Sequence, residues 1–280
     1  MDLSETEIKS KVLKGLFWKI LENGGAQGIQ FVIAIILARL LSPAEYGLVS
    51  IIMIFITIAN VVVQNGFSTA LVQKKHSDDT DFSSVFYFSL AIAAVMYAAL
   101  YASAPSIAGF YHNDVLVPIV RVLAVVLFPG AVISVQTAYV SRKMEFKGLF
   151  KATMVAVVIS GAASILMALR GMGVWAMVGQ QIAYYLALMT TLFMTVSWKP
   201  RLVFAMGRIS AMFSFGWKLL LAALLDTLFN NLYGLIMGKI YNEELLGAYN
   251  RGDQFPKLIV NNLGAAIQAV LLPAFSSRQG

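Results

Sequence analysis

The sequence has no cysteine, only two histidines and few charged residues in its 280 positions. Without cysteine, disulfide bonds and thiol catalysis are excluded. The chain also lacks a P-loop, an H-E-x-x-H pair and a G-x-S-x-G turn, so the common signatures of nucleotide, metal and serine chemistry are missing. We therefore expect no enzyme activity, no cofactor and no metal site.

Charged residues make up 12% of the chain and hydrophobic residues 59%. A soluble domain has roughly 25% charged residues and about 45–50% hydrophobic residues. The hydrophobic residues fall in blocks of about 18 to 25, and each block is long enough to cross a bilayer core about 30 Å thick as one helix. The predicted fold is all-α, a polytopic membrane helix bundle with about eight transmembrane helices. The predicted spans are Trp18–Leu40, Tyr46–Val63, Phe82–Ala102, Leu116–Tyr139, Ala152–Leu169, Val174–Val196, Phe213–Ile240 and Phe255–Phe275. The predicted connectors carry turn residues: Ser42, Pro43, Pro105, Gly171, Gly173 and Pro200.

The positions of the basic residues predict the orientation. Most of the 21 lysines and arginines fall on the same side as the N-terminus. On the opposite side are Arg39, Arg121, Arg170, Lys239, Arg251 and Lys257. Because cytosolic loops are enriched in Lys and Arg, we expect a multi-pass protein of the cell inner membrane with both ends of this sequence in the cytosol. The cations lie in loops and at helix ends rather than along one solvated face, so nucleic acid is not an expected partner.

An internal repeat is indicated by similar residues about 200 positions apart. The matching pairs are Trp18 and Trp217, Lys19 and Lys218, and Gly47 and Gly247. We interpret this as two parallel lobes related by an axis along the membrane normal. The expected organisation is a cytosolic lead-in over 1–17, an N-terminal six-helix lobe over 18–212, and the start of a truncated second lobe over 213–280. The alternative is a chance match between two leucine-rich helices.

Polar residues inside the predicted spans form two stripes. The first span carries Lys19, Asn23, Gln27 and Gln30 within about 80° of one another on a helix. The seventh carries Lys218, Asp226, Asn230 and Tyr233 on a somewhat wider stripe. Polar groups in membrane spans usually face the bundle interior or a wet cavity. We therefore expect the stripes to face a shared aqueous cavity; the alternative is that they only hydrogen-bond between helices.

Acidic residues and glycines of the same two spans carry further expectations. Asp226 is a candidate ion-coupling site, with a neutral or paired structural carboxylate as the alternative. Glu22 lies one turn from Lys19, so a solvated ion pair at the membrane interface is expected there. The motifs Gly24-x-x-x-Gly28 and Gly234-x-x-x-Gly238 permit close helix packing.

Two runs carry a family resemblance. The run L-A-R-L-L-S-P-A-E-Y-G ends at Gly47, and the run G-A-Y-N-R-G-D-Q-F-P begins at Gly247 and is followed by L-L-P at 271–273. Both resemble segments of polysaccharide and O-antigen flippases, members of the multidrug and oligosaccharidyl-lipid exporter superfamily. The resemblance implies a V-shaped bundle that opens alternately inward and outward. It also implies that undecaprenyl-diphosphate-linked oligosaccharide is moved to the outer leaflet for surface polysaccharide or lipopolysaccharide synthesis.

The resemblance also assigns roles to residues. A related peptidoglycan precursor flippase has a similar Arg-x-x-x-Phe-Pro run with a cavity-lining arginine, so Arg251 is the expected phosphate contact. That relative has arginines on its first helix where this chain has Gln27 and Ile33, which argues against the peptidoglycan precursor as cargo. The expected substrate-binding residues are Lys19, Asn23, Gln27, Gln30, Lys218, Asn230 and Arg251. Membrane lipids and a polysaccharide polymerase or export machinery are the further expected partners.

Two rival readings remain open at this stage. One is a multidrug or cation antiporter of the same superfamily, which would bind its ion at Asp226 or Glu22. The other is an inactive truncated fragment, because two helices of a second lobe bury little surface without the rest of that lobe.

Overall fold

A computed structural model describes residues 5–74, 77–241 and 244–252, and this part of the chain is helical with no strand. The helices are α1 (Glu5–Leu40), α2 (Pro43–Gln73), α3 (Asp79–Tyr111), α4 (Leu116–Leu123), the short 3₁₀ helix η1 (Ala124–Val126), α5 (Leu127–Lys143), α6 (Phe146–Leu169), α7 (Val174–Thr195) and α8 (Met206–Ile240). Residues 244–252 form a further helical segment. The predicted all-α class is confirmed.

Six segments of the described chain are long and apolar enough to cross a membrane. They are Phe17–Leu40, Pro43–Val72, Asp79–Tyr111, Leu116–Lys143, Phe146–Leu169 and Gly216–Ile240. These coincide with the predicted first to fifth and seventh spans, so the chain is a multi-pass membrane protein. The predicted sixth span is α7, whose 22 residues reach about 33 Å but include two adjacent glutamines. The predicted eighth span, 255–275, lies outside the described residues.

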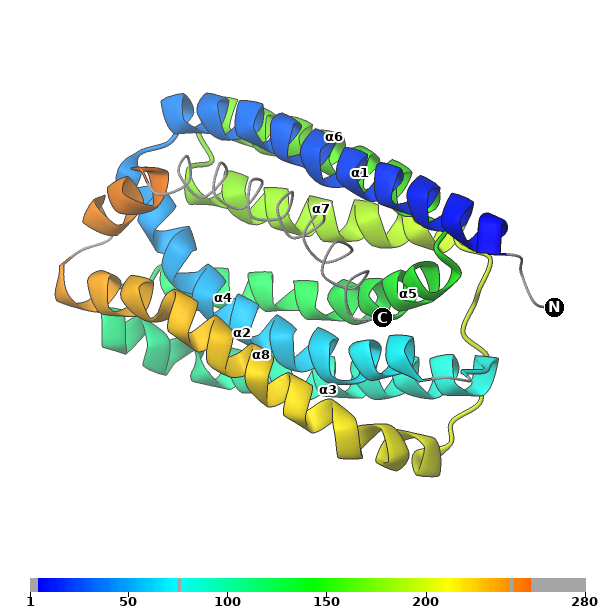
Figure 1. Cartoon of the computed structure of the whole chain (residues 1–280). Helices are drawn as coiled ribbons and strands as arrows, with labels where there is room; N and C mark the ends of the chain where they lie inside the picture. Colours follow the sequence, from blue (N-terminus) through cyan, green and yellow to red (C-terminus); the bar gives the residue numbers. More distant parts are fainter. Residues whose placement is uncertain (1–4, 75–76, 242–243, 253–280) are drawn as a thin grey trace, which may run out of the picture.

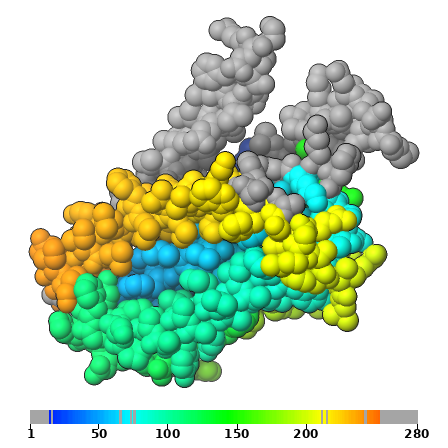
Figure 2. Space-filling view, turned by 90° about the horizontal axis from the view of Figure 1, so that it is seen from below, coloured from blue at the N-terminus to red at the C-terminus, as the bar shows by residue number. Residues whose placement is uncertain are grey.

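The helices pack as two groups joined by α4 and α5. In Figure 1, α1, α6 and α7 lie on one side of the bundle, and α2, α3 and α8 lie on the other. Helix α1 packs mainly on α6, and α8 packs mainly on α2. In the space-filling view of Figure 2, α8 lies along α2, which is visible between α8 and α3. The first and seventh predicted spans are therefore separated by other elements of the bundle.

The turn between α1 and α2 is defined by a capping box. The side chain of Ser42 accepts a hydrogen bond from the backbone nitrogen of Glu45 at 3.3 Å, and the Glu45 carboxylate accepts one from the backbone nitrogen of Ser42 at 2.7 Å. Pro43 occupies the first helical position, where a backbone N–H is not needed. The Ser-Pro-Ala-Glu sequence thus starts α2 with its first amides satisfied.

One predicted connector is wrong, because Pro105 lies inside α3 rather than after it. Proline removes the hydrogen bond to the carbonyl four residues earlier, here that of Tyr101. Nε of Arg121 lies 3.5 Å from that carbonyl oxygen, and its guanidinium carbon lies 4.2 Å from the centre of the Tyr101 ring. A neighbouring side chain therefore compensates the missing bond, which is how proline is tolerated within membrane helices.

The two Gly-x-x-x-Gly motifs have different surroundings. A methyl group placed on Gly234 would contact Ile54, and one on Gly238 would contact Ile51 and other side chains, so this motif lets α8 approach α2 closely. Among the described residues, nothing lies within 4 Å of a methyl placed on Gly24 or Gly28. The packing prediction is therefore confirmed for the second motif only.

The segment between α7 and α8, residues 196–205, is held against the start of α3. The hydroxyls of Ser83 and Ser84 each accept a hydrogen bond at 3.0 Å, the first from the backbone nitrogen of Arg201 and the second from that of Ala205. Trp198 is buried with its ring centre 5.6 Å from that of Phe82. This segment joins the predicted lobes, so its attachment positions the start of α8.

Ion pairs complete this attachment. The carboxylate of Asp81 is fully buried and lies 2.7 Å from Nζ of Lys74 and 3.0 Å from Nη1 of Arg208. Arg208 also lies 3.1 Å from the Asp78 carboxylate. The backbone amide of Asp81, and secondarily the charge of Arg208, hold the pKa of the Asp78 carboxyl below its usual value.

We predict that Asp81→Ala destabilises the protein, because it removes two charge-assisted hydrogen bonds and leaves Arg208 with the exposed Asp78 alone. The loss should be about 2–3 kcal/mol in the free energy of unfolding. Asp79→Ala is the matched control, because its pair with Arg201 is half-exposed and should contribute at most about 1 kcal/mol. Unfolding of each purified variant in the same detergent measures the difference. Equal stabilities for the two variants would contradict the prediction.

Candidate functional site

Two adjoining cavities are lined by polar residues: one of about 420 Å³ lies between the two helix groups, and one of about 230 Å³ lies between α2, α8 and the 244–252 segment. The polar residues lining the larger are Gln30 on α1, Tyr46 and Ser50 on α2, Ser160 on α6, Gln180, Gln181 and Tyr184 on α7, and Asn250 and Arg251 on the 244–252 segment. Those lining the smaller are Ser50 and Thr57 on α2, Asn230, Asn231 and Tyr233 on α8, and Tyr249 and Asn250. Because Ser50 and Asn250 line both cavities, we treat them together as the polar cleft.

Arg251 is the cation of the polar cleft. Its Nη2 donates a 2.7 Å hydrogen bond to the carbonyl oxygen of Leu41, at the end of α1. Its guanidinium carbon lies 4.2 Å from the centre of the Tyr46 ring, an arrangement typical of cation–π pairs. Its Nε is buried and has no hydrogen-bond partner in the described part of the chain. One donor of a charged group is therefore left for another acceptor.

The 244–252 segment meets α2 through two glycines. A methyl group on Gly247 would overlap the carbonyl of Pro43 and the backbone nitrogen of Gly47, so only glycine fits at this approach. Gly47 and Gly247 are one of the pairs that suggested the internal repeat. In a parallel repeat, equivalent residues near the symmetry axis lie close together, which is the arrangement found here. The repeat itself stays a prediction.

The structure brings some of the predicted site residues together and leaves others apart. Gln30, Asn230 and Arg251 line the polar cleft. Five predicted residues line neither cavity: Lys19, Asn23, Gln27, Lys218 and Asp226. The first three lie on the face of α1 that carries Gln30, toward its N-terminal end. Asp226 is exposed on α8, one turn before Asn230. Their proposed roles stay predictions.

The acidic residue of α1 has a different setting from the one predicted. Glu22 pairs with Lys19 at 2.9 Å as expected, but the Glu22 residue is only 6% exposed, so the expectation of a solvated pair is wrong. The reason is that α1 packs on α6, where the hydroxyl of Thr153 donates a 3.0 Å hydrogen bond to the Glu22 carboxylate. Both oxygens of this carboxylate therefore have partners, and it joins α1 to α6.

Sequence reasoning missed the contribution of α7. Gln180, Gln181 and Tyr184 all line the polar cleft, yet none was among the predicted site residues. The signal was present, since two adjacent glutamines followed by a tyrosine interrupt an otherwise apolar span. Asn250 was also missed, although it is next to Arg251 in the sequence.

Comparison with known proteins places the chain among proteins of polysaccharide synthesis. The profile of a family described as polysaccharide biosynthesis protein matches residues 36–280. The chain is 24% identical over 264 residues to the succinoglycan biosynthesis transport protein ExoT of Rhizobium meliloti (strain 1021), covering 94% of this chain and 53% of the relative. It is 26% identical over 276 residues to the teichuronic acid biosynthesis protein TuaB of Bacillus subtilis (strain 168), covering 97% and 57%.

A third relative is the lipopolysaccharide biosynthesis protein WzxC of Escherichia coli (strain K12), 22% identical over 280 residues, covering 97% of this chain and 56% of the relative. The chain therefore spans a little over half the length of these relatives. No solved structure matches it. The expected resemblance to polysaccharide flippases is confirmed at the level of the family, and the expectation of a transporter rather than an enzyme agrees with a relative named as a transport protein.

We predict that the polar cleft holds water, which cysteine labelling can test in a chain with no native cysteine. Gln30→Cys and Gln181→Cys should react with a charged methanethiosulfonate reagent at least roughly tenfold faster than Val32→Cys. The thiolate is the reactive form, and an apolar environment raises the thiol pKa. Val32 is the matched control because it is exposed on α1 and does not line the polar cleft. Equal labelling rates at Gln30 and Val32 would show that the cleft is dry.

Proposed function

Because the chain belongs to the polysaccharide biosynthesis protein family, we propose that it forms part of a flippase for undecaprenyl-diphosphate-linked oligosaccharide. The flippase carries the oligosaccharide from the inner to the outer leaflet of the cell inner membrane, for synthesis of surface polysaccharide or lipopolysaccharide. It does so by alternating access, in which the cavity opens to one side of the membrane and then to the other.

The observation that supports this proposal is the polar cleft itself, because α1, α2, α6 and α8, which contribute to its lining, are long and apolar enough to cross a membrane. A diphosphate cannot enter hydrocarbon without losing the hydration of its charges, which is strongly unfavourable. A cleft with amides, hydroxyls and a guanidinium offers replacement hydrogen bonds along the way. The part of the cargo that needs such a path is its large polar headgroup, since its apolar tail can stay in the lipid.

Within this cleft we assign different parts of the cargo to different residues. The guanidinium of Arg251 has a buried Nε without a partner among the described residues, so it is the proposed contact for a phosphate oxygen. The amides of Gln30, Gln180 and Gln181 supply donors and acceptors in pairs, as sugar hydroxyls require. The tail of the carrier remains in lipid, beside the cleft.

The remaining predicted residues are assigned to the approach to the cleft. Lys19, Asn23 and Gln27 continue the polar face of α1 away from Gln30, and Lys218 lies near the start of the membrane-crossing part of α8, Gly216–Ile240. With both ends of the sequence in the cytosol, this end of the bundle is the cytosolic entrance. Asp226 is the proposed ion-coupling carboxylate, positioned one turn from Asn230 at the edge of the cleft.

We predict that Arg251→Gln reduces glycan export roughly tenfold or more, because a charge-assisted hydrogen bond of about 1.5–3 kcal/mol is lost from the bound cargo. The measurement is the amount of surface polysaccharide, together with the accumulating lipid-linked intermediate, in cells that carry only the variant. Gln181→Ala should have a smaller effect in the same direction, because it removes neutral hydrogen bonds only.

Arg39→Gln is the control for charge, because Arg39 is exposed in the last turn of α1 and lines neither cavity; it should export normally. The amount of each variant in the membrane separates lost transport from lost folding, since Arg251 also binds the Leu41 carbonyl. Normal surface glycan in cells with Arg251→Gln would refute the assignment.

A further inference from the structure

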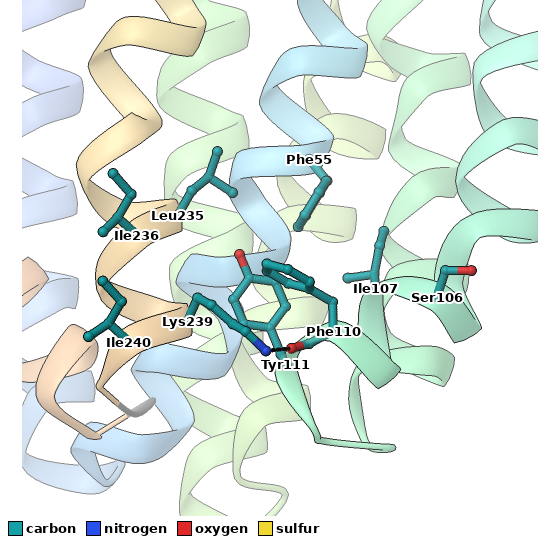
Figure 3. A pocket seen from close by; sticks show the side chains of 9 residues that line it. All are labelled: Phe55, Ser106, Ile107, Phe110, Tyr111, Leu235, Ile236, Lys239 and Ile240. Carbon is teal, nitrogen blue, oxygen red and sulfur yellow. Dashed lines mark hydrogen bonds between the residues drawn. The ribbon is translucent and has the colours of Figure 1, made fainter.

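A second, apolar groove lies on the outside of the bundle and shares no lining residue with the polar cleft. It has a volume of about 580 Å³ and is lined by nine residues of α2, α3 and α8 (Figure 3). Its walls include Phe55 of α2, Ile107 of α3 and Leu235 of α8. The space-filling view shows α2 at the bottom of a trough between α8 and α3. Because the surrounding helices cross the membrane, this groove opens to lipid.

One end of the groove carries a cation. Nζ of Lys239 donates a hydrogen bond to the carbonyl oxygen of Phe110 across the groove (Figure 3) and lies 4.4 Å from the centre of the Phe110 ring. It also lies 3.4 Å from Nε2 of His112. The ammonium group has three donors, so donors remain for an anion. Lys239 and His112 lie at the ends of α8 and α3, where a span meets the headgroup region.

Tyr111 adds a polar group just inside that end. Tyr111 is 8% exposed, and its hydroxyl is buried without a hydrogen-bond partner in the described ranges. In Figure 3 its ring lies between Lys239 and Phe55, so the hydroxyl is directed along the groove. Buried polar atoms normally have partners, and an ester carbonyl placed one step below a phosphate would supply one.

We propose that this groove binds one anionic phospholipid, with its phosphate at Lys239 and His112, an ester carbonyl at Tyr111 and an acyl chain between α3 and α8. Along the groove the side chains run from a cation to a hydroxyl to an apolar wall. This order matches the phosphate, ester carbonyl and acyl chain of a glycerophospholipid. An anionic headgroup is selected because a basic residue near the membrane surface contributes about 1 kcal/mol toward anionic lipids.

The site has a structural consequence because its walls come from both sides of the predicted lobe boundary. Phe110 belongs to the first six spans and Lys239 to the seventh. A lipid that contacts both favours the arrangement in which α8 lies against α2 and α3, since a ligand stabilises the state that it binds better. This role is independent of the identity of the transported glycan.

The test is lipid binding by the purified protein, measured by native mass spectrometry. The probes are phosphatidylglycerol and phosphatidylcholine with identical palmitoyl and oleoyl chains. Wild type should bind phosphatidylglycerol more tightly, and Lys239→Gln should raise its apparent dissociation constant roughly five-fold while phosphatidylcholine binding stays unchanged. Leu235→Trp, which fills the groove, should weaken binding of both lipids.

Matched variants make the test specific. Arg39→Gln removes an exposed cation at the same end of the bundle, and Leu232→Trp adds the same ring at an exposed position of α8 outside the groove; both should bind like wild type. If Leu235→Trp fails to fold, Ser106→Trp replaces it, since Ser106 also lines the groove. The proposal is overturned if Lys239→Gln keeps the preference for phosphatidylglycerol. It is also overturned if undecaprenyl phosphate displaces bound phosphatidylglycerol, because the groove would then serve a prenyl carrier.

Discussion

The need to satisfy every polar group inside a hydrocarbon layer governs this structure. Lipid offers no hydrogen bonds, so each span must be a helix and each polar side chain must find a partner or water within the protein. Pro105 illustrates the rule, because Arg121 lies within reach of the Tyr101 carbonyl that the proline leaves open. Glu22 illustrates it again, since its two carboxylate oxygens are divided between Lys19 and Thr153.

The same requirement separates two kinds of polar region. At the start of α3, Asp81 is fully buried and paired with two cations, and this network attaches the segment before α8. In the polar cleft, by contrast, Arg251 retains a buried donor without a partner among the described residues. Satisfied groups of the first kind fix the helices in place, whereas the Arg251 guanidinium keeps the donor that we propose for the phosphate of the cargo.

Close contact between α2 and the 244–252 segment depends on the absence of side chains. Gly247 approaches the backbone of Pro43 and Gly47 so closely that any larger residue would separate them. Arg251 then reaches Leu41 and Tyr46 from the same segment. A contact held by glycines and one arginine can be released without unfolding a helix.

The sequence by itself determined the all-helical class and the places of six of the eight predicted spans, because blocks of apolar residues of bilayer length admit only that solution. It also pointed to Gln30 and Asn230 as polar residues in apolar spans, and to Arg251 through the resemblance of the run that begins at Gly247; all three line the polar cleft. Only the tertiary structure decided which polar residues share a cavity, because that depends on how each helix is rotated and which neighbour it meets. Packing against α6 therefore took Glu22 out of solvent, and the rotation of α7 brought Gln180, Gln181 and Tyr184 into the cleft, neither of which can be read from periodicity along a single helix.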